Sequence, residues 1–215
     1  MTSGSRLPLR VLLVHGMGRT PLSLHRLSRD LNRCGFDPCS TGYLASLEPF
    51  RLIVRRIRNR LADLGASSTP YAVVSHSLGG LLVRAALARI PVSGLPAHLI
   101  MLGTPHRPPR LAQRYHRQLA YRLVNGETGQ LLAQPTFFDE LPPLSIPYTI
   151  IAGTKGWTAS RGPFAGEPND GIVALSETLV CSTDQPVVLP VRHTFMMNDR
   201  RVREVIRTVL ERVSL

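Results

Sequence analysis

The sequence predicts an α/β fold, a three-layer α/β/α sandwich around a sheet of about six mostly parallel strands. Short, continuously apolar runs alternate along the chain with amphipathic stretches at helical spacing, and strands buried on both faces have this apolar character. No internal repeat, low-complexity tract or long linker divides the 215 residues. We therefore expect one domain over residues 1–215.

The first strand is predicted at residues 10–14, where valines and leucines follow an arginine. Thr20 and Pro21 predict the beginning of a helix, because threonine is a common N-cap and proline fits the first turn. Gly35 predicts its end, and residues 36–43 predict the second strand. The buried face of this helix is predicted to contain Leu24, Leu27 and Leu31.

A second helix is predicted at residues 46–64, because apolar residues recur there at helical spacing while arginines occupy the other face. Residues 71–75 predict the third strand, and residues 77–90 predict the helix after it, which Pro91 ends. The buried face of the second helix is predicted to contain Leu47, Phe50, Val54, Ile57 and Leu61.

Three further apolar runs complete the predicted sheet, at residues 98–102, 148–152 and 186–189. A last helix is predicted at residues 199–213, where valine, isoleucine and leucine repeat at helical spacing. Residues 103–147, between the fourth and fifth strands, are expected to form a short cap-like insertion. One helical face of this insertion is predicted to contain Leu111, Tyr115 and Leu119.

The chain has 26 basic and 14 acidic side chains, a net charge of +12, so its surface attracts anions. No nucleic-acid-binding motif or basic tail accompanies this charge, and we expect solvated arginines and no nucleic-acid partner. A peripheral contact with anionic lipid stays open, because arginines surround the apolar residues of the 103–147 insertion. The oligomeric state stays open as well.

The sequence contains no apolar run long enough for a membrane span and no secretory signal at its start, so we expect a cytoplasmic location. The chain has three cysteines, an odd number without metal-ligand spacing, which suits reduced thiols. They are Cys34, Cys39 and Cys181, and a disulfide between the first two stays open. We expect neither a metal nor a cofactor.

Ser77 lies between the third predicted strand and its helix, in the segment SHSLGG at 75–80. A serine hydroxyl becomes an effective nucleophile when it is exposed and lies next to a base, and a sharp strand-to-helix turn exposes it. Such a turn needs small residues two positions before and after the serine, and Ser75 and Gly79 meet that need. We therefore predict that Ser77 is a nucleophile rather than only an N-cap.

The chain resembles the α/β-hydrolase superfamily, in particular small bacterial lipases and esterases, in five segments that occur in the same order. They are VLLVHGMGRT at 11–20, VVSHSLGG at 73–80, LIMLGTPH at 99–106, EPNDGIVALSE at 167–177 and HTFMMND at 193–199. The resemblance covers nearly the whole chain and implies an α/β-hydrolase fold without a large lid. It also implies a nucleophile, an acid and a base in that order along the chain.

Asp170 is the predicted acid. No Asp or Glu lies between Asp63 and Glu127, so the loop after the fourth strand cannot supply one, and Asp170 follows the fifth strand, where the resembled family has its acid. The weaker alternatives are Glu167, Asp139 and Glu140. His193 is the predicted base, because no other histidine follows His116 and His193 lies just before the terminal helix.

The resemblance further implies two backbone donors for an oxyanion. One is the NH group of Met17, which follows a His-Gly pair after the first strand, and the other is the NH group of Leu78, next to Ser77. Aromatic residues are candidates for the wall of an acyl pocket. They are Phe137, Phe138, Trp157 and Phe164.

These assignments predict a serine carboxylic-ester hydrolase that acts on small-molecule esters of short or medium acyl chains through an acyl-enzyme on Ser77. An acyltransferase that passes the same acyl group to an alcohol or amine is the alternative, because the sequence does not distinguish water from another acceptor. A binding module without catalysis is a third hypothesis, and the intact set of Ser77, Asp170 and His193 argues against it.

Overall fold

Six parallel strands form the central sheet, in the order β2-β1-β3-β4-β5-β6. The computed structural model describes residues 7–67 and 69–214. The strand order reverses between β1 and β3, and ligands of open α/β sheets bind at the carboxyl ends of the strands at such a point. The strands are β1 (Arg10–Val14), β2 (Asp37–Thr41), β3 (Tyr71–His76), β4 (His98–Leu102), β5 (Tyr148–Gly153) and β6 (Val187–Leu189).

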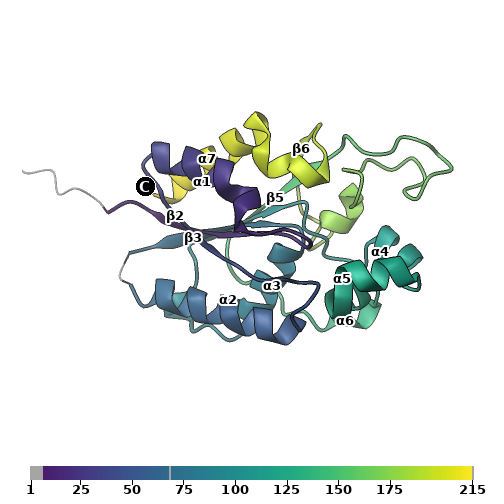
Figure 1. Ribbon diagram of the computed structural model, residues 1–215. Coiled ribbons are helices and arrows are strands. Elements are labelled where there is room, and N and C mark those ends of the chain that lie inside the picture. Colours follow the sequence, from purple (N-terminus) through teal and green to yellow (C-terminus); the bar gives the residue numbers. More distant parts are fainter. Residues whose placement is uncertain (1–6, 68, 215) are drawn as a thin grey trace, which may run out of the picture.

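Helices cover both faces of the sheet, which confirms the predicted three-layer sandwich (Figure 1). Successive side chains of a strand point to opposite faces, so β1 contributes to two apolar cores. Val11 and Leu13 belong to the core under α1 and α7, while Leu12 and Val14 belong to the core over α2 and α3. The bounds of these helices are α1 (His25–Arg33), α2 (Phe50–Gly65), α3 (Leu78–Leu87) and α7 (Arg200–Val213).

The second predicted helix begins later than expected. α2 starts at Phe50, and Leu47, which was predicted on its buried face, is 79% exposed. Pro49 is extended (φ −59°, ψ 139°), and a residue before proline avoids the helical conformation, so the helix cannot run through Glu48 and Pro49. Val54 is only partly buried. The buried residues of α2 are Phe50, Ile53, Ile57, Leu61 and Leu64.

Thr20 and Pro21 occupy the predicted positions: Thr20 is the N-cap, with an extended backbone (φ −130°, ψ 171°), and Pro21 lies in the first turn. This first turn is a 3-10 turn (Pro21–Leu24) that precedes α1, and the side chain of Thr20 makes no capping hydrogen bond. The carbonyl of Thr20 accepts the NH group and the hydroxyl of Ser23. α3 ends at Leu87, before the predicted boundary at residue 90. The chain continues into a tighter turn, in which the NH group of Ile90 donates to the carbonyl of Leu87 (3.0 Å).

Residues 103–147 contain helices that lie beside the carboxyl ends of the strands (Figure 1). The prediction that Leu111, Tyr115 and Leu119 share one helical face is wrong. The chain leaves the helical conformation at Gln118 (φ −73°, ψ 135°), and Leu119, which begins the next helix, is 69% exposed. The helices are α4 (Arg110–Tyr115), α5 (Leu119–Leu131) and α6 (Pro135–Asp139).

The cysteines form no disulfide within the described ranges. Cys34 and Cys181 are exposed, Cys39 is half-buried, and all three are free thiols. Over residues 7–67 and 69–214, none of the helices is both long and apolar enough to cross a membrane. The same ranges contain no group of three or more His, Cys, Asp or Glu side chains arranged to hold a metal ion.

Candidate active site

Ser77 lies at the sharp turn between β3 and α3. Its backbone has φ 53° and ψ −124°, a conformation that is strained for a residue other than glycine and persists only when neighbouring groups hold it. Its NH group donates to the carbonyl of Leu102 (2.8 Å). Its carbonyl accepts the NH group of Gly80 (3.0 Å) and the hydroxyl of Thr104 (3.0 Å). These bonds hold the strained turn at the carboxyl edge of the sheet.

The turn brings backbone segments so close together that small residues are required. A Cβ atom on Gly79 would lie 2.5 Å from the carbonyl oxygen of His15 and 2.7 Å from that of Val14. Ser75 is buried, and its hydroxyl donates to the carbonyl of Ile100 (3.2 Å). A serine with a satisfied hydroxyl therefore fits on the strand side of the turn, where the nucleophile motif usually has glycine.

Ser77, His193 and Asp170 form one chain of hydrogen bonds. The Ser77 hydroxyl donates to Nε2 of His193 (2.9 Å), and Nδ1 of His193 donates to Oδ2 of Asp170 (2.6 Å). Oδ1 of Asp170 accepts the NH groups of Ile172 (2.9 Å) and Val173 (2.8 Å), which fixes the plane of the carboxylate. A carboxylate at Nδ1 favours the tautomer in which Nε2 accepts a proton from the serine. The arrangement is suited to nucleophilic catalysis.

His76 and Gly103 support the position of His193. His76 is buried behind the turn, and its Nε2 donates to the carbonyl of His193 (3.0 Å). Burial, together with the nearby His193, lowers the pKa of His76 well below its ordinary value, so His76 stays neutral. A Cβ atom on Gly103 would lie 3.0 Å from both Oδ2 of Asp170 and Nδ1 of His193. A larger residue than glycine would therefore disturb the pair.

Met17 and Leu78, the predicted oxyanion donors, line the same cavity as Ser77. Leu78 is the first residue of α3, and the first NH groups of a helix have no acceptor within it. In the described part of the chain, the NH groups of Met17 and Leu78 have no protein acceptor. Both are therefore available to bind an oxygen that becomes negative during a reaction.

His15 and Tyr43 hold the loop that carries Met17. Nδ1 of His15 donates to the carbonyl of Gly16 (2.9 Å), and the ring stacks on Tyr43 with centroids 4.0 Å apart. The Tyr43 hydroxyl donates to the carbonyl of His15. Burial lowers the pKa of His15 and raises that of Tyr43, so both side chains stay neutral. No sequence motif marks this role of Tyr43, because Tyr43 follows β2 and meets the loop only in the fold.

The weaker candidates for the acid do not contact His193. Glu167 pairs with Arg110 and accepts the NH group of Ser176 (2.9 Å). Although burial raises the pKa of Glu167, the hydrogen bonds from Ser176 and Arg110 outweigh it, and the pKa is lowered. Asp139 and Glu140 are exposed at the end of α6. The structure thus brings Asp170, and none of these three carboxylates, to the imidazole.

A cavity of about 490 Å³ opens at Ser77. Leu111, Tyr115 and Tyr121 from α4 and α5 line it. Val124 also lines it and is 64% exposed, so the cavity reaches the surface beside α5. Tyr121 and Val124 were missed in the sequence, because the break between α4 and α5 decides which face of α5 meets the cavity.

None of the four aromatic candidates for the wall of an acyl pocket lines this cavity. The Phe137 ring packs edge-on against Phe50 and Phe138, with centroids 5.1 and 5.2 Å away. Phe164 is buried elsewhere, and Trp157 is 58% exposed. Aromatic character alone did not distinguish core residues from wall residues, since both favour burial of apolar surface.

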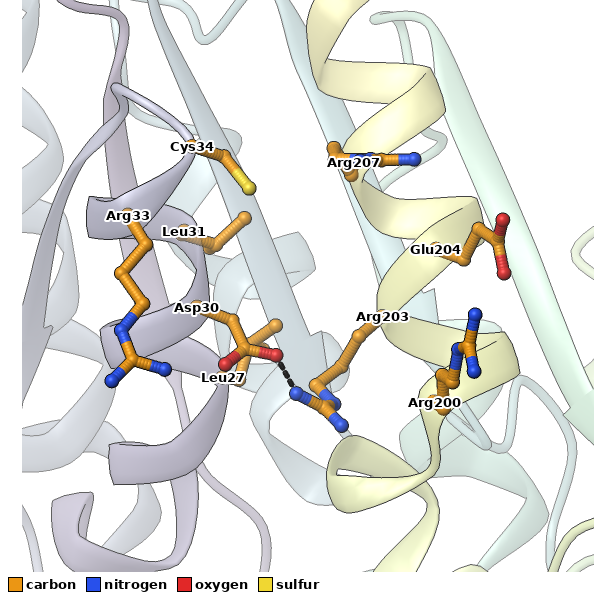
Figure 2. A pocket seen from close by; sticks show the side chains of 9 residues that line it. All are labelled: Leu27, Asp30, Leu31, Arg33, Cys34, Arg200, Arg203, Glu204 and Arg207. Atoms are coloured by element: carbon orange, nitrogen blue, oxygen red, sulfur yellow. Dashed lines mark ion pairs between the residues drawn. The ribbon is translucent and has the colours of Figure 1, made fainter.

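A second concave surface lies between α1 and α7, where Asp30 and Arg203 point toward each other as an ion pair (Figure 2). Arg200 and Glu204 lie on the side of α7 away from Asp30 (Figure 2). This groove shares no lining residue with the cavity at Ser77. The ion pair joins α1 to α7, and the groove lies apart from Ser77, His193 and Asp170, so it is not the candidate site.

The sequence and the fold were both compared with those of known proteins. A sequence model of the alpha/beta hydrolase family matches residues 11–213. No curated protein matches the chain by sequence.

Among solved structures, lipase BlEst2 of Bacillus licheniformis in its mature form has a TM-score of 0.75 at 18% identity, over 95% of this chain and 92% of that chain. A structure from work on the metagenome-derived lipolytic enzymes LipS and LipT has a TM-score of 0.66 at 14% identity, over 95% and 93%. A structure from work on carboxylesterases of the thaumarchaeon Nitrososphaera gargenis has a TM-score of 0.63 at 11% identity, over 98% and 93%. At these identities the likeness shows the fold.

Proposed function

The chain belongs to the alpha/beta hydrolase family, and we propose that it hydrolyses carboxylic esters of short to medium acyl chains through an acyl-enzyme on Ser77. The observation that carries the proposal is the continuous hydrogen-bond chain from Ser77 through His193 to Asp170. The proposal includes residues 103–147 as a short cap-like insertion of a single domain.

In the first step, Oγ of Ser77 attacks the ester carbonyl and its proton passes to Nε2 of His193. The carbonyl oxygen becomes an oxyanion, which the NH groups of Met17 and Leu78 bind. Donors of this kind contribute roughly 3 to 4 kcal/mol to transition-state stabilisation in serine hydrolases. Asp170 stabilises the imidazolium that forms.

In the second step, the bond to the alcohol breaks, and Nε2 of His193 gives its proton to the leaving oxygen. A water molecule then enters and gives a proton to His193 as its oxygen bonds the acyl carbon. The new intermediate breaks the bond to Ser77, which recovers its proton from His193. The products are the alcohol and the free acid, and the site returns to its starting state.

The size and lining of the cavity are consistent with an acyl group of limited length. Its volume of about 490 Å³ and its apolar lining, which includes Leu111, Leu132 and Val173, suit an alkyl chain. The structural neighbours described as a lipase and carboxylesterases support a carboxylic ester as the substrate.

Acyl transfer to an alcohol or amine is the second candidate, and the apolar lining of the cavity favours it because such a lining disfavours bulk water. The two reactions share the acyl-enzyme and differ in the acceptor. Adding an alcohol during turnover in water separates them. A product ratio dominated by free acid supports hydrolysis, and one dominated by the new ester supports transfer.

The proposal is tested by measuring hydrolysis of a chain-length series of p-nitrophenyl esters by the wild type and by Ser77→Ala. We expect the variant to lose at least roughly a thousandfold in kcat, as triad nucleophiles do. Ser28→Ala, on α1 and away from the cavity, is the matched control and should keep wild-type rates. Equal rates for Ser77→Ala and the wild type would contradict the proposal.

A further inference from the structure

Arg19 is the one permanently charged side chain among the described residues that line the cavity at Ser77. The same lining contains no Asp or Glu. Arg19 follows β1 in the loop that also carries Met17, and it is half-buried. A positive charge in a partly apolar cavity attracts a negative ligand more strongly than the same charge on an open surface does.

The guanidinium of Arg19 is held next to the base. Its Nη2 donates to the carbonyl of Thr194 (3.2 Å), and its Cζ lies 5.7 Å from the centroid of the Phe195 ring. Thr194 and Phe195 directly follow His193 in the chain. These contacts place the charge on the side of the cavity where His193 lies.

Among the described residues, no carboxylate pairs with Arg19. Within residues 7–67 and 69–214 it forms no ion pair, whereas Arg110 pairs with Glu167 and Arg203 pairs with Asp30. A guanidinium has five NH donors, and the residues that the structure describes accept one hydrogen bond from Arg19. The remaining donors match the geometry of a carboxylate or phosphate.

The position of Arg19 indicates which part of an ester it meets. The leaving oxygen must lie near Nε2 of His193 to receive its proton, so the alcohol part occupies the side of the cavity with His193 and Arg19. The walls from α4 and α5 are apolar and suit the acyl chain. We propose that Arg19 binds an anionic group, a carboxylate or a phosphate, on the alcohol part of the ester, so that the protein prefers anionic esters.

This inference rests on the proposed ester hydrolysis and is tested with matched substrates. The butanoyl ester of 4-hydroxybenzoate carries a carboxylate on its leaving group, and the butanoyl ester of 4-hydroxybenzamide is its neutral counterpart. A third ester, of 4-hydroxyphenyl phosphate, distinguishes phosphate from carboxylate as the preferred anion. The quantity compared is the ratio of kcat/KM for each anionic ester to kcat/KM for the neutral ester.

We expect Arg19→Gln to lower this ratio roughly tenfold, the size of a lost charge-assisted hydrogen bond at a half-buried site. Arg19→Lys should keep part of the preference because it keeps the charge. Arg107→Gln is the matched control: Arg107 is exposed and does not line the cavity, so the ratio should stay at the wild-type value.

A structural role for Arg19 gives a different result. If Arg19→Gln changed kcat/KM for charged and neutral esters by the same factor, the residue would position His193 only, and the inference would be overturned. If the wild type hydrolysed none of the esters faster than Ser77→Ala, the proposed function itself would fail. The two failures are therefore distinguishable.

Discussion

Asp170 holds the imidazole of His193 through one oxygen and is itself held through the other. Oδ2 accepts the ring NH group, while Oδ1 accepts the NH groups of Ile172 and Val173. The backbone NH of His193 also donates to the carbonyl of Asp170 (3.0 Å). The carboxylate therefore has little freedom to rotate. Its effect on His193 depends on Oδ2, which accepts a hydrogen bond from Nδ1 and cannot donate one.

Asp170→Asn is expected to keep the fold and lower kcat by roughly a factor of ten thousand, because an amide that donates to Nδ1 favours the wrong imidazole tautomer. Steady-state kinetics with a p-nitrophenyl ester measures this loss. The comparison is Glu167→Gln, which removes a carboxylate of the same segment that does not contact His193. Similar losses in the two variants would mean that Asp170 has no special role.

At the scale of elements, the junction of β3 and α3 is packed against the end of β1. Gly79 is the contact point, since its Cα faces the carbonyl oxygens of Val14 and His15. The strained backbone of Ser77 lies two residues earlier and depends on the same packing. Stability and the position of Ser77 are therefore linked at this junction.

Gly79→Ala is expected to lower the free energy of unfolding by about 1 to 3 kcal/mol, because the new methyl group collides with backbone rather than with a flexible side chain. It should also lower kcat, since the collision moves Ser77. Chemical denaturation measures the first effect. Gly94→Ala is the control, because its Cβ atom would lie 3.4 Å from the nearest atom, an ordinary contact. Equal stability of the two variants would contradict this account.

At the scale of the whole molecule, three neutral histidines are built into the interior. His15, His76 and His106 are 1%, 2% and 6% exposed. Burial lowers the pKa of each, and for His106, with Arg84 nearby as a second cause, it lowers the pKa to about 3. Nδ1 of His106 accepts a hydrogen bond from Arg84 (3.3 Å). The fold thus requires these imidazoles uncharged.

We expect the protein to lose stability as the pH falls below about 6.5, where histidine in the unfolded chain becomes protonated. The unfolded state then binds more protons than the folded state, so the free energy of unfolding falls toward acid. Each buried histidine changes the free energy of unfolding by up to about 1.4 kcal/mol per pH unit in this range. Above neutral pH these histidines are uncharged in both states and no longer make stability depend on pH.

Urea denaturation at several pH values between 6.5 and 5 measures this slope. His106→Gln should reduce it, because glutamine can accept the bond from Arg84 and does not titrate. His25→Gln, which removes an exposed histidine, is the control and should leave the slope unchanged. A flat stability profile in this range for the wild type would contradict the prediction.

Patterns of apolar and turn residues predicted most of the fold, because strands and helices form largely according to the conformational preferences of neighbouring residues. All six strands were predicted within two residues of their observed ends, since a short apolar run between turn residues is a sufficient signal. Helix ends were less accurate. Leu47 and Leu119 fitted a helical period in the sequence, yet the chain conformation at Pro49 and Gln118 places both outside the predicted helices.

Patterns in the amino-acid sequence were sufficient to predict the sheet, the layers and the candidate nucleophile, because strand periodicity and the turn around Ser77 depend on residues adjacent in the chain. They also left His193 as the candidate base by elimination. That Ser77 meets His193, which is 116 residues away, and that Arg19 and Val124 line the same cavity follows from the three-dimensional fold alone. These contacts join loops and helices from different elements, and their geometry follows from how the sheet and helices pack.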